Sequence, residues 1–195
     1  MNFYEHFQYI CGKMARKVGF MARISGYLSS WTKCLVYKTI VLPHLEFCST
    51  ILYLANKTDL QKMQKIQNRA MRIIIGVGRY TSINLMLSTL NFVSIEEHIW
   101  INSMVFIYKI IKGLQPGYMS DNIIYNKDVH CHNTRGCSDL FIDRRDRVRA
   151  QNTIFYRGFR DYNKLPLNIK NAKTVIEMKM LLQKLKKTER ANSVA

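Results

Sequence analysis

The sequence predicts a mainly α-helical protein, a helical bundle followed by a small α+β region rich in basic residues. Apolar residues recur every three or four positions through most of the first 113 residues, which is the spacing of one face of a helix. After residue 118 this periodicity gives way to polar, irregular sequence and to two short runs typical of strands. We expect a helical region at 1–113, an irregular linker at 114–135, an α+β region at 136–187 and a frayed tail at 188–195.

The stretch around which the chain is organised, residues 27–76, predicts two consecutive helices. Ser29 or Ser30 can cap the first of them, because a serine hydroxyl accepts a hydrogen bond from a free backbone N–H of the first turn. Pro43 lies inside the first helical pattern. Since proline has no backbone N–H, we expect a kink or a break there.

The second of these helices carries signals at both ends. Thr58 with Gln61 predicts a capping box at its start, and Gly76 predicts an end in the left-handed conformation. Its apolar stripe consists of Leu60, Met63, Ile66, Ala70, Ile73 and Ile74. The opposite face carries Lys62, Lys65, Arg69 and Arg72. That face is typical of a solvated surface, and a ridge facing nucleic acid is the alternative.

Further helices are expected at 3–28, 82–89, 95–111 and 175–187. Ser94 with Glu97 and Thr174 with Glu177 predict capping boxes for the last two, and Gly113 predicts a stop. The apolar stripe expected for the last helix is Ile176, Met180, Leu181 and Leu185. In the α+β region, residues 139–142 and 152–156 predict short strands, and residues 158–164 predict one or two helical turns.

The charge of the chain favours an anionic partner. The 195 residues include 30 basic and 13 acidic side chains, a formal net charge of +17 that is spread along the whole chain. Such an excess is self-repelling unless a partner neutralises it, and nucleic acid is the first candidate, ahead of an anionic membrane surface. No secretory signal or transmembrane span is recognised. Five scattered cysteines favour an intracellular, reduced protein.

Two groups of residues invite a catalytic or metal-binding interpretation, and the sequence favours neither. Asp143 and Asp146 lie among arginines, where carboxylates act as local salt partners, and Glu96 and Glu97 are adjacent in a helix start. The four potential zinc ligands of the HCHNTRGC stretch are His130, Cys131, His132 and Cys137. Their spacing fits a tetrahedral ion poorly, so a surface loop is the better interpretation. We expect no catalytic residue, no metal and no cofactor.

The strongest pattern interleaves arginines with aromatic residues over 145–166. The arginines are Arg145, Arg147, Arg149, Arg157 and Arg160, and the aromatic residues are Phe155, Tyr156, Phe159 and Tyr162. Arginines can bind phosphates while aromatic rings stack on unpaired bases. The alternative is that the aromatic residues belong to the core and the arginines form a solvated rim around it.

Six stretches, taken in order, resemble one region of a known family. They are HFQYICGKMARKVGFMARIS, TIVLPHLEFCSTI, LQKMQKIQNRAMRIIIG, IYKIIKGLQPGYM, HNTRG and FYRGFRDYNKLPLNIKNAKTVIEMKMLLQKLKK. The chain is similar, over about residues 3–187, to the C-terminal part of reverse transcriptases of LINE-type, jockey-like non-LTR retrotransposons. The resemblance implies that residues 3–76 are the thumb, the helices that hold the template–primer duplex, and that the rest is a basic region binding RNA or target DNA.

The resemblance also implies where nucleic acid binds. By position, Lys13, Arg16, Lys17 and Arg23 would face it, and Arg135 and Arg157 occupy the family's most recognisable basic positions. Tyr162 stands where the family usually has tryptophan, and the palm's Tyr-Xaa-Asp-Asp signature is missing from the sequence. We therefore expect a non-catalytic, nucleic-acid-binding fragment of the polymerase, for RNA, an RNA–DNA hybrid or target DNA, with a palm-bearing segment as a conceivable partner in trans. The alternative is a non-functional remnant or a helical protein-interaction module.

Overall fold

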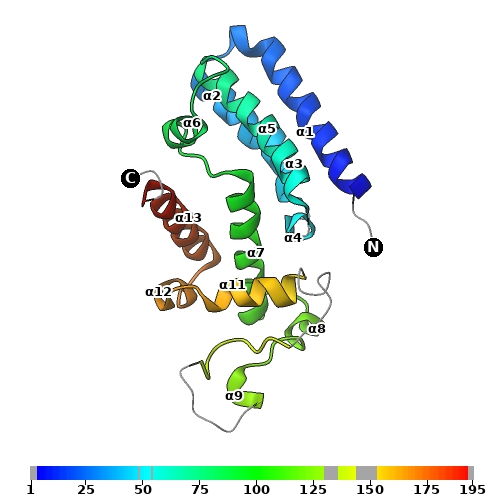
Figure 1. The fold of residues 1–195 in the computed structure, drawn as a ribbon, viewed down its shortest axis with the longest axis vertical. Helices are drawn as coiled ribbons and strands as arrows, with labels where there is room; N and C mark the ends of the chain where they lie inside the picture. Colours follow the sequence, from blue (N-terminus) through cyan, green and yellow to red (C-terminus); the bar gives the residue numbers. More distant parts are fainter. Residues whose placement is uncertain (1–3, 48, 54, 130–135, 144–152, 193–195) are drawn as a thin grey trace. The chain divides into compact units, whose positions relative to one another are not determined.

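The computed structural model describes residues 4–47, 49–53, 55–129, 136–143 and 153–192. These residues form helices joined by turns, which confirms the mainly α fold (Figure 1). No strand occurs in the described ranges, and an isolated antiparallel bridge joins Tyr125 to Leu140. The chain forms two compact units, Met1–Ile99 and Trp100–Ala195. The boundary falls inside helix α7, Ile95–Ile111, upstream of the predicted linker at 114–135.

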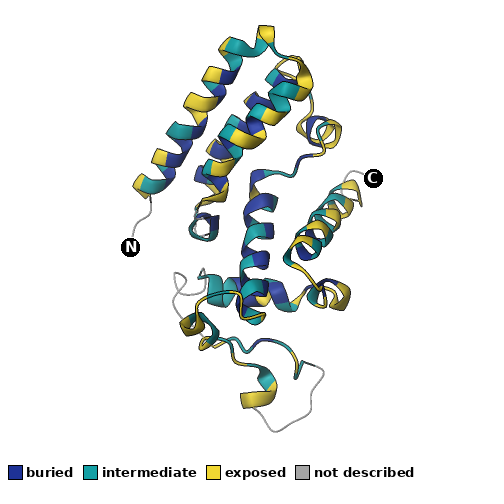
Figure 2. Cartoon of the chain, turned by 180° about the vertical axis from the view of Figure 1, so that it is seen from behind, coloured by how far each residue is buried: buried dark blue, intermediate teal, exposed yellow. Residues whose placement is uncertain are grey.

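The first unit is a bundle around two long helices. Its elements are α1 (Tyr4–Ile24), η1 (Ser25–Tyr27), α2 (Ser30–Val36), η2 (Tyr37–Val41), α3 (Leu42–Glu46), α4 (Ser49–Leu52), α5 (Lys57–Ile75) and α6 (Ile83–Thr89). Helix α1 packs along α5, and α2, η2 and α3 lie against one or both of them. The buried residues of α1 follow the side that faces α5 (Figure 2). They are Phe7, Ile10, Cys11, Met14, Val18 and Met21.

The interruption expected at Pro43 takes the form of a wider helical turn. The π-helical turn Tyr37–Val41 directly precedes α3, in which Pro43 is the second residue. A helix that meets a proline must accommodate both the missing N–H and the ring, and a π turn does so without ending the helix. At the other end of this segment the predicted cap is confirmed, since the backbone N–H of Thr32 donates to Ser29 Oγ at 3.2 Å.

Helix α5 begins two positions earlier than its predicted capping box implies. Asn56 is the N-cap, so Thr58 already lies inside the first turn and the Thr58–Gln61 box is wrong. The predicted end is confirmed: Gly76 has φ +81° and donates its N–H to the carbonyl of Arg72 at 2.8 Å. Because φ is positive there, a glycine is favoured over any residue with a Cβ.

The core face of α5 is more polar than its sequence predicts. Met63, Ala70 and Ile74 of the predicted stripe are buried, whereas Leu60, Ile66 and Ile73 are only half-buried. Asp59, Gln67 and Asn68 are buried in their place. Two glutamines of α5 bond to the chain before α7: Gln67 Nε2 donates to the Val93 carbonyl at 2.9 Å, and Gln64 Oε1 accepts from the Ile95 N–H at 2.9 Å. These bonds fasten the segment before α7 to α5.

The second unit surrounds the apolar part of α7. Its other elements are α8 (Gly117–Ser120), α9 (Asn126–Val129), η3 (Ile154–Gly158), α11 (Phe159–Asn163), α12 (Leu167–Lys170) and α13 (Val175–Asn192). The predicted irregular linker at 114–135 contains the short helices α8 and α9. Tyr108 of α7 donates its hydroxyl to the Ala172 carbonyl at 2.7 Å, and Lys186 of α13 lies 4.1 Å from the centre of the Trp100 ring. These contacts attach α13 and the chain before it to α7.

The predicted capping box of α7 forms, and that of α13 forms in part. Ser94 N–H donates to Glu97 Oε2 at 2.7 Å, and Glu97 N–H donates to Ser94 Oγ at 3.3 Å. At α13, Glu177 N–H donates to Thr174 Oγ1 at 3.1 Å, while the Glu177 carboxylate accepts from the N–H of Lys173, one residue before the expected donor.

The predicted strand at 152–156 is wrong over its described part. Ile154–Gly158 form a π-helical turn that continues into α11. Phe155 meets Phe159 edge-on at 5.7 Å between ring centres, a contact that needs helical spacing. Gly158 lies so close to α7 that a Cβ on it would come within 2.8 Å of Ile107 Cδ1. This packing selects a helix where the local pattern predicts a strand.

Residues 139–142 do not form the predicted strand either. Their extended backbone makes the Tyr125–Leu140 bridge and two neighbouring bonds, from Phe141 N–H to Ile124 O and from Asn126 N–H to Asp139 O. On its other side the segment meets a side chain, that of Asn163, in place of another strand. Without a second ladder the segment remains a single bridge.

Helix α13 is longer than predicted and buries a different face. It runs to Asn192, through most of the expected frayed tail at 188–195. Met178 and Leu182 are buried, whereas Ile176 and Met180 of the predicted stripe are 73% and 59% exposed. Both pairs have the spacing of four that places residues on one helix face. The spacing alone could not decide which pair faces the core.

Candidate nucleic-acid interface

Four basic residues lie on the outward face of α1, the position that the resemblance implied for nucleic acid. Arg16, Lys17 and Arg23 are exposed and Lys13 is half-buried. The buried residues of α1 occupy the opposite side of the cylinder. Since side chains three and four apart share a helix face, Lys13, Arg16 and Lys17 are brought together within about 6 Å of helix axis.

Three of these cations line a hollow on the surface of the first unit. The hollow has a volume of about 420 Å³ and is lined by Lys13, Arg16 and Lys17, with Phe20 of α1 and Ile40 of η2. We call it the basic groove. Its position depends on the fold, because Ile40 is brought beside α1 by the packing of the η2 turn. Sequence reasoning identified the three cations but had no signal for the apolar part contributed by Ile40.

Aromatic rings border the same face of α1. Lys13 Nζ lies 4.9 Å from the centre of the Tyr9 ring, and Tyr9 is 58% exposed. Arg16 is oriented by its Nε, which donates to the Gly12 carbonyl at 3.3 Å. The face therefore combines guanidinium and ammonium groups, which bind phosphate oxygens, with rings that can contact sugars or bases.

Two long stretches of this unit contain no carboxylate side chain. Between Glu5 and Glu46 the sequence has no acidic residue, and between Asp59 and Glu96 it has none either. Asp59 itself is buried and paired with Lys62 at 3.2 Å. The positive potential of the α1 face is thus not cancelled by neighbouring acids on α1 beyond its first turn, on α2 or on η2, which is the condition for attracting a polyanion.

The basic ridge predicted on α5 is divided by the structure. Lys65 and Arg69 are exposed, as expected for a face directed away from the core. Lys62 is engaged with Asp59 and lies 5.7 Å from the centre of the Tyr4 ring. Arg72 is half-buried. Only the middle of the ridge is therefore disposed as a free cationic surface.

The arginine-rich stretch of the second unit is described in part. Arg135, Arg145, Arg147 and Arg149 lie outside the described residues. Arg157 is half-buried in η3. Arg160 of α11 has a 54% exposed side chain, and its Nε lies 4.0 Å from Asp161 Oδ1. These two arginines occupy consecutive turns, and only Arg160 is largely accessible.

The aromatic residues of that stretch are divided between the two interpretations. Phe159 and Tyr162 are buried, with 2% and 6% exposure, so they belong to the core. Burial raises the pKa of Tyr162 to about 12, which is consistent with that position. Phe155 and Tyr156 are half-buried. Base stacking in this region would depend on those two residues alone.

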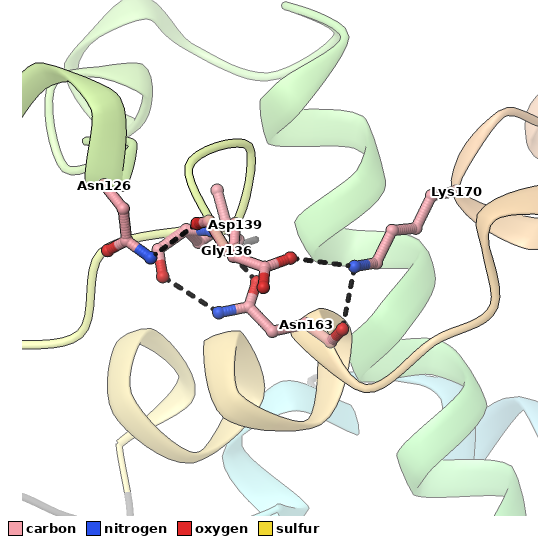
Figure 3. A network of polar contacts seen from close by, with 6 residues as sticks. Asn126, Gly136, Asp139, Asn163 and Lys170 are labelled. Atoms are coloured by element: carbon pink, nitrogen blue, oxygen red, sulfur yellow. Dashed lines mark hydrogen bonds and ion pairs between the residues drawn. The ribbon is translucent and has the colours of Figure 1, made fainter. Parts of the chain in front are cut away.

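A polar network that sequence reasoning missed holds residues 136–140 in place (Figure 3). Asn163 clasps Leu140 with both ends of its amide, accepting from the Leu140 N–H at 3.0 Å and donating to the Leu140 carbonyl at 2.9 Å. Lys170 Nζ pairs with Asp139 at 3.1 Å and donates to the Asn163 carbonyl at 2.7 Å. Asn126 Nδ2 donates to the Gly136 carbonyl at 2.8 Å. We call these contacts the polar clasp.

The segment held by the polar clasp lies, in sequence, between predicted nucleic-acid-binding arginines. In sequence, residues 136–140 lie between Arg135 and the arginines at 145, 147 and 149. The clasp therefore holds described residues that lie between these arginines in the sequence. Neither Asn163 nor Lys170 carries a local signal for this role, because their partners are 23 and 31 residues away in the chain.

The metal and catalytic interpretations gain no support. His130, Cys131 and His132 lie outside the described residues, and Cys137 is a free, half-buried thiol. Within the described ranges no three His, Cys, Asp or Glu residues are grouped as a metal site would require. Glu97 serves the α7 cap, and Asp143 is exposed, while Asp146 lies outside the described part of the chain.

Comparison with known proteins does not identify the chain. No protein-family model, curated protein or solved structure matches it. Among the described residues no helix is both long enough and apolar enough to cross a membrane.

Proposed function

We propose that this chain is a non-catalytic nucleic-acid-binding module. The observation that carries the proposal is the basic groove, in which Lys13, Arg16 and Lys17 converge beside Phe20 and Ile40, within a stretch (6–45) that has no acidic residue. Phosphates of a nucleic-acid backbone are the ligands that such a groove favours, because they accept hydrogen bonds from several cations spaced along a strand. The binding is directed at the backbone and depends little on sequence.

Within this proposal, the chain corresponds to the thumb and C-terminal region of a LINE-type reverse transcriptase. The ordered series of six motifs supports this assignment, as does a helical first unit over the residues that would form the thumb. The palm signature is missing from the sequence, so polymerase chemistry would need a palm-bearing segment in trans. RNA, an RNA–DNA hybrid and target DNA are the ligands that this assignment favours.

The physical mechanism is release of condensed counterions. Each phosphate neutralised by a lysine or arginine releases about 0.9 cation from duplex DNA and about 0.7 from a single strand, so affinity falls steeply with salt. Loss of the three groove cations should therefore lower the slope of log K against log salt by about 2 to 3. A module that binds by apolar contacts would show almost no slope.

The test is fluorescence anisotropy with structured RNA, single-stranded DNA and an RNA–DNA hybrid, each at several salt concentrations. The variant Lys13→Ala/Arg16→Ala/Lys17→Ala should weaken binding to all three ligands and flatten the salt dependence. The matched control is Lys164→Ala/Lys173→Ala/Lys184→Ala, which removes the same charge from three exposed lysines of the second unit. Equal losses in both variants would show a general polycation effect and contradict the role of the groove.

A second candidate function is a helical protein-interaction module. It is favoured by the exposed apolar residues Leu167, Ile176 and Met180 of α12 and α13, which are 71%, 73% and 59% exposed. Exposed apolar side chains on neighbouring helices are typical of surfaces that bind other proteins or self-associate. Sedimentation velocity over a range of concentrations tests this: association abolished by Ile176→Ser/Met180→Ser, together with absence of nucleic-acid binding, would favour it over our proposal.

A further inference from the structure

Three aromatic side chains of the first unit are almost entirely exposed. Tyr27, the last residue of η1, is 92% exposed, Trp31 in the first turn of α2 is 73% exposed, and Tyr80 in the chain after α5 is 98% exposed. We call them the aromatic end. Rings of this size normally bury most of their surface in the folded state. The exposure of three such rings on one unit is therefore unusual.

The three residues lie at the same end of the bundle, although they are up to 53 positions apart in sequence. Helices α1 and α5 pack along each other, and Asp59 and Lys62 near the start of α5 are close enough to Cys11 of α1 to act on the pKa of its thiol, so these parts of the two helices are side by side. From Cys11 and from Lys62, thirteen further residues lead to the last residue of each helix, Ile24 and Ile75. The two helices therefore run parallel and end at the same level, as Figure 1 shows.

Helix α2 returns in the opposite direction and begins at that same end. The Tyr37 side chain, at the end of α2, lies beside Gln67 of α5. Ser30, seven residues before Tyr37, is then level with Ile74, seven residues after Gln67. Thus η1, the first turn of α2 and the chain leaving α5 lie together (Figure 1).

Only cationic charge accompanies these rings. The basic residues nearest to them in sequence are Arg23, Lys33 and Arg79, and neither 6–45 nor 60–95 contains an acidic residue. Arg23 also continues the line of basic residues from the basic groove, about 15 Å along α1 from Lys13 at 1.5 Å per residue. A strand bound in the groove would therefore be led along α1 to the aromatic end.

We infer that the aromatic end is a stacking site for unpaired bases. Aromatic rings next to lysine and arginine are the combination that binds single strands, since every base has a face that stacks and every nucleotide a phosphate. The inference rests on the proposed function, and it specifies the substrate class: single-stranded nucleic acid, or a duplex that ends in an unpaired overhang. The groove binds the backbone, and the aromatic end adds affinity where bases are unpaired.

The experiment compares a blunt RNA–DNA hybrid with the same hybrid carrying a four-nucleotide single-stranded overhang that contains 2-aminopurine. The intact chain should bind the overhang form more tightly than the blunt form and should quench the 2-aminopurine fluorescence. The variant Tyr27→Ala/Trp31→Ala/Tyr80→Ala should lose this preference by roughly tenfold, because each stacked base contributes measurably to affinity. Its affinity for the blunt hybrid should stay within about twofold, since phosphate contacts dominate there.

Controls separate stacking from folding and from general loss of aromatic surface. The three side chains are exposed, so circular dichroism should show unchanged helix content. Tyr27→Phe/Tyr80→Phe keeps both rings and should retain the preference. The variant Phe47→Ala/Tyr118→Ala removes exposed rings elsewhere, at 70% and 65% exposure, and should leave the preference unchanged.

Each outcome has a distinct meaning. If the intact chain binds neither hybrid, the proposed function itself fails. If it binds both hybrids equally, or if the triple alanine variant keeps the preference and the quenching, the proposed function stands and the stacking site is refuted. If sedimentation shows that the triple variant abolishes a dimer of the free protein, the aromatic end is a self-association surface and the inference is likewise overturned.

Discussion

The two units of the molecule differ in the balance between apolar packing and directed side-chain bonds, although the first unit also has directed bonds from Gln64 and Gln67. In the first unit, α1 and α5 bury aliphatic and methionine side chains against each other, and its surface is left cationic. In the second unit, α7 supplies an apolar core, but residues 136–140 are held by directed bonds from Asn163 and Lys170. Apolar packing is non-directional, whereas a side-chain clasp requires particular atoms.

This difference has a consequence for where function can reside. A unit whose stability comes from its interior can carry an unbalanced charge on its outer face, as α1 does with Arg16, Lys17 and Arg23. A unit that depends on a polar clasp is sensitive to single polar substitutions at its surface. We therefore expect surface changes to alter binding in the first unit and stability in the second.

The largest effect is expected from opening a cavity in the first unit. Met14 of α1 has no exposed surface, so Met14→Ala should lower the free energy of unfolding by about 3 kcal/mol. Urea unfolding followed by circular dichroism measures this change. Arg16→Ala on the same helix is exposed and should stay within about 0.5 kcal/mol. Equal effects of the two substitutions would contradict the burial of α1.

The chain has two tryptophans, one in each unit, which sharpens this comparison. In a Trp31→Phe background, Trp100 is the sole tryptophan, and its fluorescence reports the unfolding of the second unit. If the units owe their stability to separate cores, Met14→Ala should shift the circular-dichroism transition more than the Trp100 fluorescence transition. Identical shifts would show that the two units unfold as one.

The next largest effect is expected from removing the polar clasp. Asn163→Ala leaves the N–H and carbonyl of Leu140 without their partner, and Leu140 is 2% exposed. A buried backbone N–H or carbonyl without a hydrogen-bond partner costs about 1–3 kcal/mol. We therefore expect a loss of about 2 kcal/mol in the free energy of unfolding. Asn168→Ala, at an exposed position of α12, is the control and should be nearly neutral. Trp100 fluorescence in urea gives the measurement.

Alkaline pH should affect both units, because each contains a described tyrosine whose pKa is raised. Burial raises the pKa of Tyr37 and of Tyr162 from 10.0 to about 12, and Gln67 partly opposes the shift at Tyr37. The unfolded chain releases these protons first. The associated stability is therefore present below pH 10 and is lost as the pH rises toward 12.

The measurement is the urea midpoint between pH 9 and pH 12, followed by circular dichroism and by Trp100 fluorescence. Tyr37→Phe should reduce the pH dependence of the midpoint measured by circular dichroism. Tyr162→Phe should reduce the pH dependence of the midpoint measured by Trp100 fluorescence. Tyr80→Phe, whose ring is 98% exposed, should change neither. A pH dependence that persists in both buried variants would show that other groups cause it.

The sequence was most informative where signals are local. A serine cap at Ser29 or Ser30, the stop at Gly76 and the Ser94–Glu97 box were predicted, and the structure has Ser29 as the cap, because a cap depends on atoms within four positions. Lys13, Arg16 and Lys17 were singled out by the resemblance, and their role in binding stays a prediction; helical spacing explains only why they lie on one side of α1.

Contacts between distant residues could not be predicted in the same way. Residues 154–156 read as a strand locally, yet Gly158 packs against Ile107 and draws them into a helix. The hollow of the basic groove needs Ile40, and the polar clasp joins Asn163 to Leu140, 23 residues away. Nothing within a window of a few residues carries that information, because it depends on tertiary packing that overrides local preference.

The smallest effect on the free energy of unfolding is expected on α13, where helical spacing could not decide which face of the helix is buried. Ile176→Ser/Met180→Ser should change the free energy of unfolding by no more than about 0.5 kcal/mol, because both side chains are already in water. Met178→Ala, one helix face away and without exposed surface, should cost about 2–3 kcal/mol. Thermal or urea unfolding of the two variants side by side decides the register. The reverse order would mean that α13 buries the face its sequence predicted, and that the exposed patch considered for protein binding is part of the core.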